Sequence, residues 1–170
     1  EERFILHWGE MGTKWGINRT VAQIHALLYL SPKPLNAEDI STTLSVARSN
    51  VSNSLHELQG WGIVKVVHVL GDRRDHFESL KDVWEMFQII LDERKSREVD
   101  PTLSLLRELN EAKSTYSSGD VYAAERIEEV LELLELMTKW YGYVRVLPRP
   151  GLKLFIKAGA KIQKAFGGFK

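Results

Sequence analysis

Apolar residues recur at helical spacing along most of the chain, with polar residues between them. In the first thirty residues they fall three or four positions apart, which predicts helices over about 3–15 and 18–31. One face of the first predicted helix carries four large apolar side chains, Phe4, Trp8, Met11 and Trp15. The beginning of the chain is therefore expected to be helical.

The next segment predicts two shorter helices joined by a tight turn at 45–47. Asn36 is expected to be the N-cap of the first, which runs to about Leu44, because its side chain can accept from free backbone amides. The second covers about 47–59 and has apolar residues at helical spacing on one side, Val51, Leu55 and Leu58. Its other side is polar, which leaves that face available to a polar partner.

A β-hairpin is predicted after this polar-faced helix. The run "GIVKVVHVL" (62–70) is rich in β-branched residues, and "GDRRDHFE" (71–78) follows with two arginines in a loop. A helix, a tight turn, a polar-faced helix and then a hairpin make a winged helix-turn-helix, with the hairpin at 63–80 as the wing. In that fold the second helix enters the major groove of DNA.

The C-terminal half has the pattern of long amphipathic helices. One follows the hairpin, another is expected to restart with Asp100 as N-cap and Pro101 in the first turn, and the longest covers 120–144. The longest helix carries leucines on two neighbouring faces, which favours core on one side and a partner subunit on the other, although plain core is an alternative. The predicted fold is mainly α with a small β-hairpin: a winged helix-turn-helix domain plus long C-terminal dimerisation helices.

Three regions follow from these patterns. Residues 1–80 are expected to hold the N-terminal helices and the winged helix-turn-helix domain, residues 81–147 a helical dimerisation region, and residues 148–170 a basic amphipathic tail. The chain contains seven basic and no acidic residues from 145 to 170, whereas 120–135 contains six acidic residues and one arginine. Docking of the tail on an acidic surface is preferred over extra DNA contact or membrane contact.

Composition restricts the chemistry. Hydrophobic content of 44% and charged content of 27% are typical of a globular domain, and the absence of cysteine excludes disulfides and thiolate metal sites. The five histidines have no metal-ligand spacing, and the chain has no phosphate-binding glycine loop or nucleophile elbow. We therefore expect no enzyme activity, metal or cofactor. Without a membrane-length apolar run or a visible signal peptide, a cytoplasmic location is the default.

The polar face of the 47–59 helix supplies the candidate DNA contacts. Serine and asparagine are mediocre helix formers, but their short side chains suit base edges and phosphate oxygens. With the turn and the wing included, the candidates are Ser45, Arg48, Ser49, Asn50, Ser52, Asn53, His56, Lys65, Arg73 and Arg74. The segment 31–80 has five basic and six acidic residues, a net charge of minus one. This predicts a modest electrostatic footprint, so two copies would be needed to gather enough phosphate contacts.

A protein-binding module with the same fold is the alternative to a DNA-binding protein. Such a module would be expected to expose apolar or aromatic anchors on the 47–59 helix. Because this face carries serine, asparagine and arginine instead, the residues favour double-stranded DNA.

The wing "GDRRDHFESLKDVWEMF" after a helix-turn-helix resembles the GbsR branch of the MarR-like transcriptional regulators. The similarity extends in outline from "HWGEMGTKWGINRTVAQIHALLYL" into the C-terminal helices, and the wing is its specific part. The resemblance implies a homodimeric winged-helix repressor acting on a pseudo-palindromic operator. Some members of that family respond to choline-like ligands, which implies a small cationic effector here.

Aromatic side chains could hold such a cation through their ring faces. The first helix and the end of the longest helix are the aromatic-rich parts of the chain, and they would form a cage if they lay together near a dimer seam. The candidates are Trp8, Trp15, Trp140 and Tyr141, although aromatic residues at helical spacing are more often core.

Overall fold

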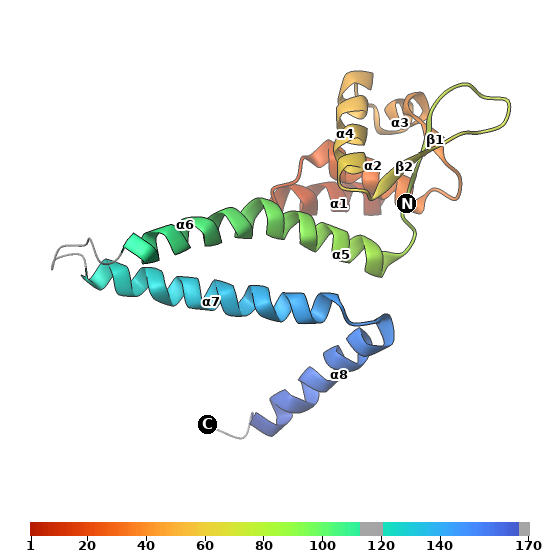
Figure 1. Ribbon diagram of the computed structural model, residues 1–170. Helices are drawn as coiled ribbons and strands as arrows, with labels where there is room; N and C mark the ends of the chain where they lie inside the picture. Colours follow the sequence, from red (N-terminus) through yellow and green to blue (C-terminus); the bar gives the residue numbers. More distant parts are fainter. Residues whose placement is uncertain (113–120, 167–170) are drawn as a thin grey trace. The chain divides into compact units, whose positions relative to one another are not determined.

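The computed structural model describes residues 1–112 and 121–166, and the chain divides into two compact units at residues 93 and 94. The first unit contains α1 (Glu2–Lys14), α2 (Arg19–Leu30), β1 (Leu35–Asn36), α3 (Ala37–Leu44), α4 (Arg48–Gly60), β2 (Val64–Val67), β3 (His76–Ser79) and α5 (Val83–Arg94). The second contains η1 (Lys95–Val99), α6 (Asp100–Glu111), α7 (Val121–Arg145) and α8 (Arg149–Phe166). Figure 1 shows these elements in chain order.

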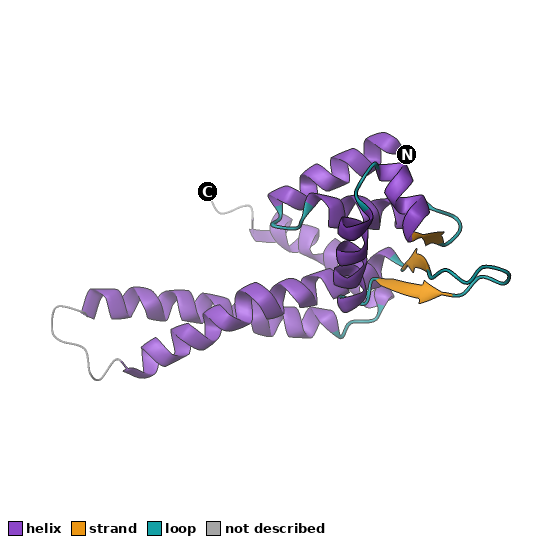
Figure 2. Ribbon diagram, turned by 90° about the horizontal axis from the view of Figure 1, so that it is seen from above, coloured by secondary structure: helices purple, strands orange, loops and turns teal. Residues whose placement is uncertain are grey.

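The predicted fold class is confirmed, because the structure is mostly helical with one small sheet (Figure 2). The sheet has three strands rather than two, in the order β1-β3-β2, and all neighbours are antiparallel. The sequence analysis missed β1, in which Leu35 pairs with Phe77 and Asn36 with His76. A pair of residues is too short to show the alternation that predicts a strand.

The core of the first unit lies among α2, α3, α4 and the sheet. Its fully buried side chains are aliphatic and come from the three helices and the residue just before β2: Ile24, Leu28, Ile40, Val51, Leu58 and Ile63. Met86 of α5 belongs to the same core, so α5 packs on the winged domain. The predicted domain boundary after residue 80 therefore lies before α5, whereas the first compact unit continues to residue 93.

Helix α1 packs on α2 through a face that its large residues did not indicate. Ile5, Gly9 and Gly12 are its buried positions, whereas Phe4 and Trp15 are exposed. A Cβ atom added to Gly12 would lie 2.6 Å from the Ala22 Cβ, so only glycine allows this approach of the two backbones. Small residues therefore determine how the first two helices meet.

Lys81, just after the sheet, closes the C-terminal end of α2. Its ammonium donates to the Leu28, Tyr29 and Ser31 carbonyls at 2.8, 2.9 and 2.7 Å. Carbonyls at a helix end have no partner within the helix, and a cation there also interacts favourably with the helix dipole. Lys81 thus connects the segment that follows β3 to the C-terminal end of α2.

Helix α6 begins at Asp100 with Pro101 in its first turn, as predicted, but Asp100 is not its N-cap. Asp100 has helical backbone angles (φ −62°, ψ −42°), and the chain enters α6 directly from the π-helix η1. The Asp100 carboxylate accepts from the Lys95 ammonium at 2.6 Å instead of capping a helix. Because a proline ring crowds the carbonyl one turn earlier, the wider π-turn before Pro101 provides room for the helix to continue.

In the second unit, α6 and α7 run antiparallel and pack side by side (Figure 1). Arg107 bridges them through Glu135, with 2.9 Å between the Arg107 Nη2 and Glu135 Oε1. Leu131 of α7 is buried, but the neighbouring face of α7 remains exposed at Leu133, Leu136 and Met137. The last four residues of the predicted tail lie outside the described residues, and the rest of it forms α8.

Candidate nucleic-acid interface

The turn between α3 and α4 has the tight geometry that the sequence predicts. Ser45 has φ 53°, the left-handed region, and Ser41 holds the turn through two hydrogen bonds to Val46. The Ser41 hydroxyl donates to the Val46 carbonyl at 2.7 Å, and the Val46 amide donates to the Ser41 carbonyl at 3.1 Å. These contacts fix the direction in which α4 leaves α3.

The two sides of α4 differ in burial as predicted. Val51, Leu55 and Leu58 are buried in the core, together with Ser54. All six polar candidates on the helix are exposed: Arg48, Ser49, Asn50, Ser52, Asn53 and His56. The structure thus presents one continuous face of hydrogen-bonding side chains, with a single guanidinium in its first turn.

The strands of the wing place Lys65 opposite Glu78. The two residues are register partners on β2 and β3, and the Lys65 ammonium lies 2.9 Å from the Glu78 carboxylate. The lysine side chain is still 64% exposed. Its charge is therefore partly compensated but accessible at the surface of the wing.

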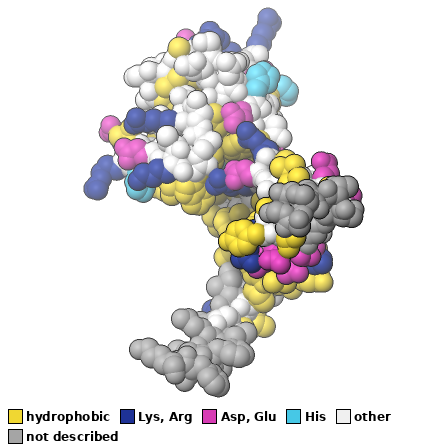
Figure 3. Space-filling view, turned by 90° about the vertical axis from the view of Figure 1, so that its left-hand side faces the viewer, with side chains coloured by type: hydrophobic (Ala, Val, Ile, Leu, Met, Phe, Trp, Pro, Cys, Tyr) yellow, Lys and Arg dark blue, Asp and Glu magenta, His cyan; other side chains and the backbone are white. Residues whose placement is uncertain are grey.

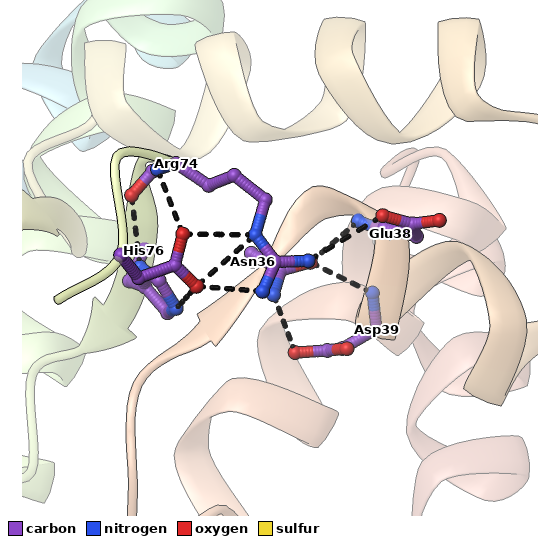
Figure 4. Close-up of polar contacts among 6 residues, drawn as sticks. Asn36, Glu38, Asp39, Arg74 and His76 are labelled. Carbon is purple, nitrogen blue, oxygen red and sulfur yellow. Dashed lines mark hydrogen bonds and ion pairs between the residues drawn. The ribbon is translucent and has the colours of Figure 1, made fainter. Parts of the chain in front are cut away.

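The two wing arginines have different surroundings. Arg74 donates to Asp72 through its Nη2 at 2.6 Å and through its Nε at 3.0 and 3.1 Å, and its Nη1 lies 3.4 Å from Glu38 (Figure 4). Arg73 is exposed and has no hydrogen bond or ion pair with any residue that the structure describes. Arg73 is thus the freer of the two positive charges.

The Asp72–Arg74 pair also changes both acid–base equilibria. The hydrogen bonds from Arg74 lower the pKa of the Asp72 carboxyl, and the same bonds raise the pKa of the Arg74 guanidinium. His76 adds a contact of 3.5 Å between its Nε2 and the Asp72 carboxylate. Both side chains of the pair remain charged at neutral pH, and the loop before β3 is held by ionic contacts.

Sequence analysis missed the contact of Arg74 with Glu38 at the start of α3. Glu38 and Asp39 are bound to the Asn36 cap of α3: the Asn36 carbonyl oxygen accepts from both backbone amides at 3.0 Å. Figure 4 shows this cap beside the Arg74 side chain, so the wing and the start of α3 meet here. The spacing of Asp72 and Arg74 did indicate an ion pair between them, because side chains two residues apart in a loop can reach each other.

The predicted aromatic cage is divided between the two units. Trp8 and Trp15 lie on α1, whereas Trp140 and Tyr141 lie on α7. The Trp8 ring stacks on Phe4 with centroids 5.3 Å apart, and the Trp140 ring is 6.1 Å from Phe155. Within each unit these rings therefore contact other aromatic side chains. Among the described side chains, no cluster of metal-ligating residues is found.

The comparisons with known proteins agree with this geometry. Residues 15–75 match the MarR family model, a segment that includes α2 to α4 and most of the wing. Two Bacillus subtilis proteins are each 24% identical over 149 residues, or 88% of this chain: YvaV, named as an HTH-type transcriptional regulator, and the HTH-type transcriptional repressor OpcR. The matches cover 84% of YvaV and 80% of OpcR.

A solved structure described as a transcriptional regulator has the same fold. It superposes with a TM-score of 0.61 at 18% identity and covers 85% of this chain and 94% of its own. No helix in the described part of the chain is long and apolar enough to cross a membrane. The chain therefore has a winged helix-turn-helix fold, and residues 15–75 of it match the MarR family model.

Proposed function

We propose that this protein is a sequence-specific DNA-binding transcriptional regulator, and in particular a repressor. One observation carries the proposal: the whole polar face of α4 is exposed while its apolar face is buried in the core. A helix that follows a tight turn and presents serine, asparagine and arginine to solvent suits the major groove. The names of YvaV and OpcR support the same role.

The contacts are divided between α4 and the wing. Arg48, in the first turn of α4, is the candidate for reading guanine, and the serines and asparagines of α4 supply hydrogen bonds to bases and phosphates. Lys65, Arg73 and Arg74 would lie on the backbone or in the minor groove. Because Arg74 is held by Asp72, its position is set before DNA arrives, whereas Arg73 is free to follow a phosphate.

A homodimer is part of the proposal. Hydrophobic side chains remain on the molecular surface (Figure 3), and those on α7 form one face: Leu133, Leu136, Met137 and Trp140. A second copy would cover this face and bring a second reading helix to a pseudo-palindromic operator. We also propose that the protein belongs to the GbsR-like branch and acts in the cytoplasm on DNA, with residues 81–147 as the dimerisation region.

A small cationic effector of the choline type completes the proposal. The aromatic candidates on α1 and α7 would hold it if the dimer brings the two sets together. The cation would change the affinity for DNA only if it binds the DNA-binding conformation of the dimer and the other conformation with different affinities. The test is titration with choline: it should alter DNA binding by the wild type but not by Trp8→Ala with Trp140→Ala.

Fluorescence anisotropy tests the central proposal. The probes are the duplex upstream of the protein's own gene and a scrambled duplex, each measured across a salt series. Arg48→Ala should weaken binding to the native duplex by roughly 1–3 kcal/mol and relax preference at one base step. Arg73→Ala should weaken binding to both duplexes and flatten the salt slope by about one.

The matched control is Arg3→Ala, which removes an exposed arginine from α1, outside the turn, α4 and the wing. It should leave the affinity and the salt slope unchanged. No preference for any duplex at low salt would refute the proposal and favour a winged helix that binds protein.

A further inference from the structure

The tip of the wing carries an apolar side chain in full contact with solvent. Leu70 is 105% exposed, the largest fraction for any large hydrophobic residue in the described chain, and Val69 beside it is 39% exposed. In both ribbon views the loop between β2 and β3 projects away from the helices of its unit (Figures 1 and 2). Leu70 therefore contributes nothing to the core that would explain an apolar residue there.

The backbone presents this leucine in a defined way. The Asp72 amide donates to the Val69 carbonyl at 3.1 Å, which closes a four-residue turn with Leu70 in its second position. Gly71, in the third position, has φ 87°, the geometry of a type II turn. The Asp72 side chain that ends the turn is in turn bound by Arg74. The turn is thus held at Asp72 by Arg74, while the Leu70 side chain points into solvent.

Its neighbours determine which partner fits. Arg73 is a free cation three residues away, and Arg74 adds a second, pre-positioned one. One leucine offers too little apolar area for a stable protein interface, which typically buries roughly 800 Å² per partner. An apolar wedge flanked by arginines is what the minor groove of duplex DNA accepts, since the cations neutralise phosphates while the wedge enters between base steps.

We propose that Leu70 is a wedge that enters the minor groove beside the half-site read by α4. This inference rests on the proposed DNA-binding function. Insertion would partly unstack one base step, so pyrimidine–purine steps, which unstack most easily, should be preferred where the wing lies. Sequence preference would then extend beyond the bases that α4 contacts.

The experiment uses the full-length protein and a duplex that the wild type selects from a randomised pool. Leu70→Ser should weaken binding to that duplex roughly tenfold, whereas Leu70→Met, which keeps an apolar tip, should stay within about twofold. Hydroxyl-radical footprinting, which reports on the minor groove, should show lost protection at the flanks and retained protection at the centre. Thermal melting should not change, because Leu70 is fully exposed.

The control is Leu6→Ser, which removes an apolar side chain that is 41% exposed on α1, outside the wing, α4 and the proposed dimerisation region. It should leave affinity and footprint unchanged. Equal affinity and equal flanking protection for Leu70→Ser and the wild type would overturn the wedge while leaving the DNA-binding function intact. If the wild type selects no duplex, the function itself fails and the wedge with it.

Discussion

His25 is a buried polar residue whose surroundings disfavour its charged form. It lies on α2 between Trp8 and Tyr29, with ring centroids 6.4 and 6.3 Å away, and its Nε2 has no hydrogen-bond partner among the described residues. Burial, and secondarily the positive charge of Lys81, lower the pKa of His25 to about 4. The neutral imidazole is therefore part of the folded state.

Stability should depend on pH through this residue. Between about pH 6.5 and 4 the unfolded chain binds a proton that folded His25 does not, so stability is lost as the pH falls through this window. Lowering the pH from about 7.5 to 5 should reduce the free energy of unfolding by on the order of 2 kcal/mol through His25. Urea unfolding of the wild type and His25→Phe at both values measures it. An equal loss in both proteins would contradict the assignment.

At the scale of helices and strands, some elements could be predicted from the sequence and others could not. Helix α4 was predictable because its buried leucines repeat at helical spacing and polar residues occupy the other side. The Asn36 cap was predictable because capping depends on local side-chain chemistry. Strand β1 and the contact between Arg74 and Glu38 were not, because both join residues about forty positions apart in the chain.

The contact between α1 and α2 gives the prediction at this scale. Gly12→Ala should destabilise the protein by roughly 1–3 kcal/mol, because the new Cβ would lie 2.6 Å from the Ala22 Cβ and the helices must separate. Hydrophobic periodicity could not find this contact, since it assigns no weight to glycine. Thermal or urea unfolding measures the loss.

Gly60→Ala makes the same chemical change at the end of α4, where a Cβ meets nothing within 4 Å. It should be neutral or stabilising by up to about 1 kcal/mol, because alanine is the better helix former. If both alanine variants have the same stability, close packing of α1 on α2 is not what requires glycine.

At the scale of the whole molecule, the exposed apolar surface of α7 is the face that the proposed homodimer would cover. Leu131 faces α6 and is buried, but Leu136 is 67% exposed and lies among other apolar side chains. A single chain thus covers only one of the two apolar faces that the sequence predicted for this helix. Covering the second face by another copy would remove it from water.

Leu136→Glu should give a monomer, because a carboxylate would have to be buried without a partner at the proposed interface. Light scattering with chromatography measures the mass, and DNA affinity should fall with it. Lys139→Glu places the same residue on an exposed position of α7 away from this face and should remain dimeric. A dimeric Leu136→Glu protein would place the interface elsewhere.

The Lys81 contacts with the end of α2 also have a consequence for folding kinetics. They join residues at least 50 positions apart, so they can form only after a long loop has closed. Contacts of this kind usually form after the transition state, and their loss then accelerates unfolding more than it slows refolding. In Lys81→Met the unfolding limb of a urea chevron should rise while the refolding limb stays in place. The lifetime of the folded winged domain would then depend on a lysine far from its reading helix.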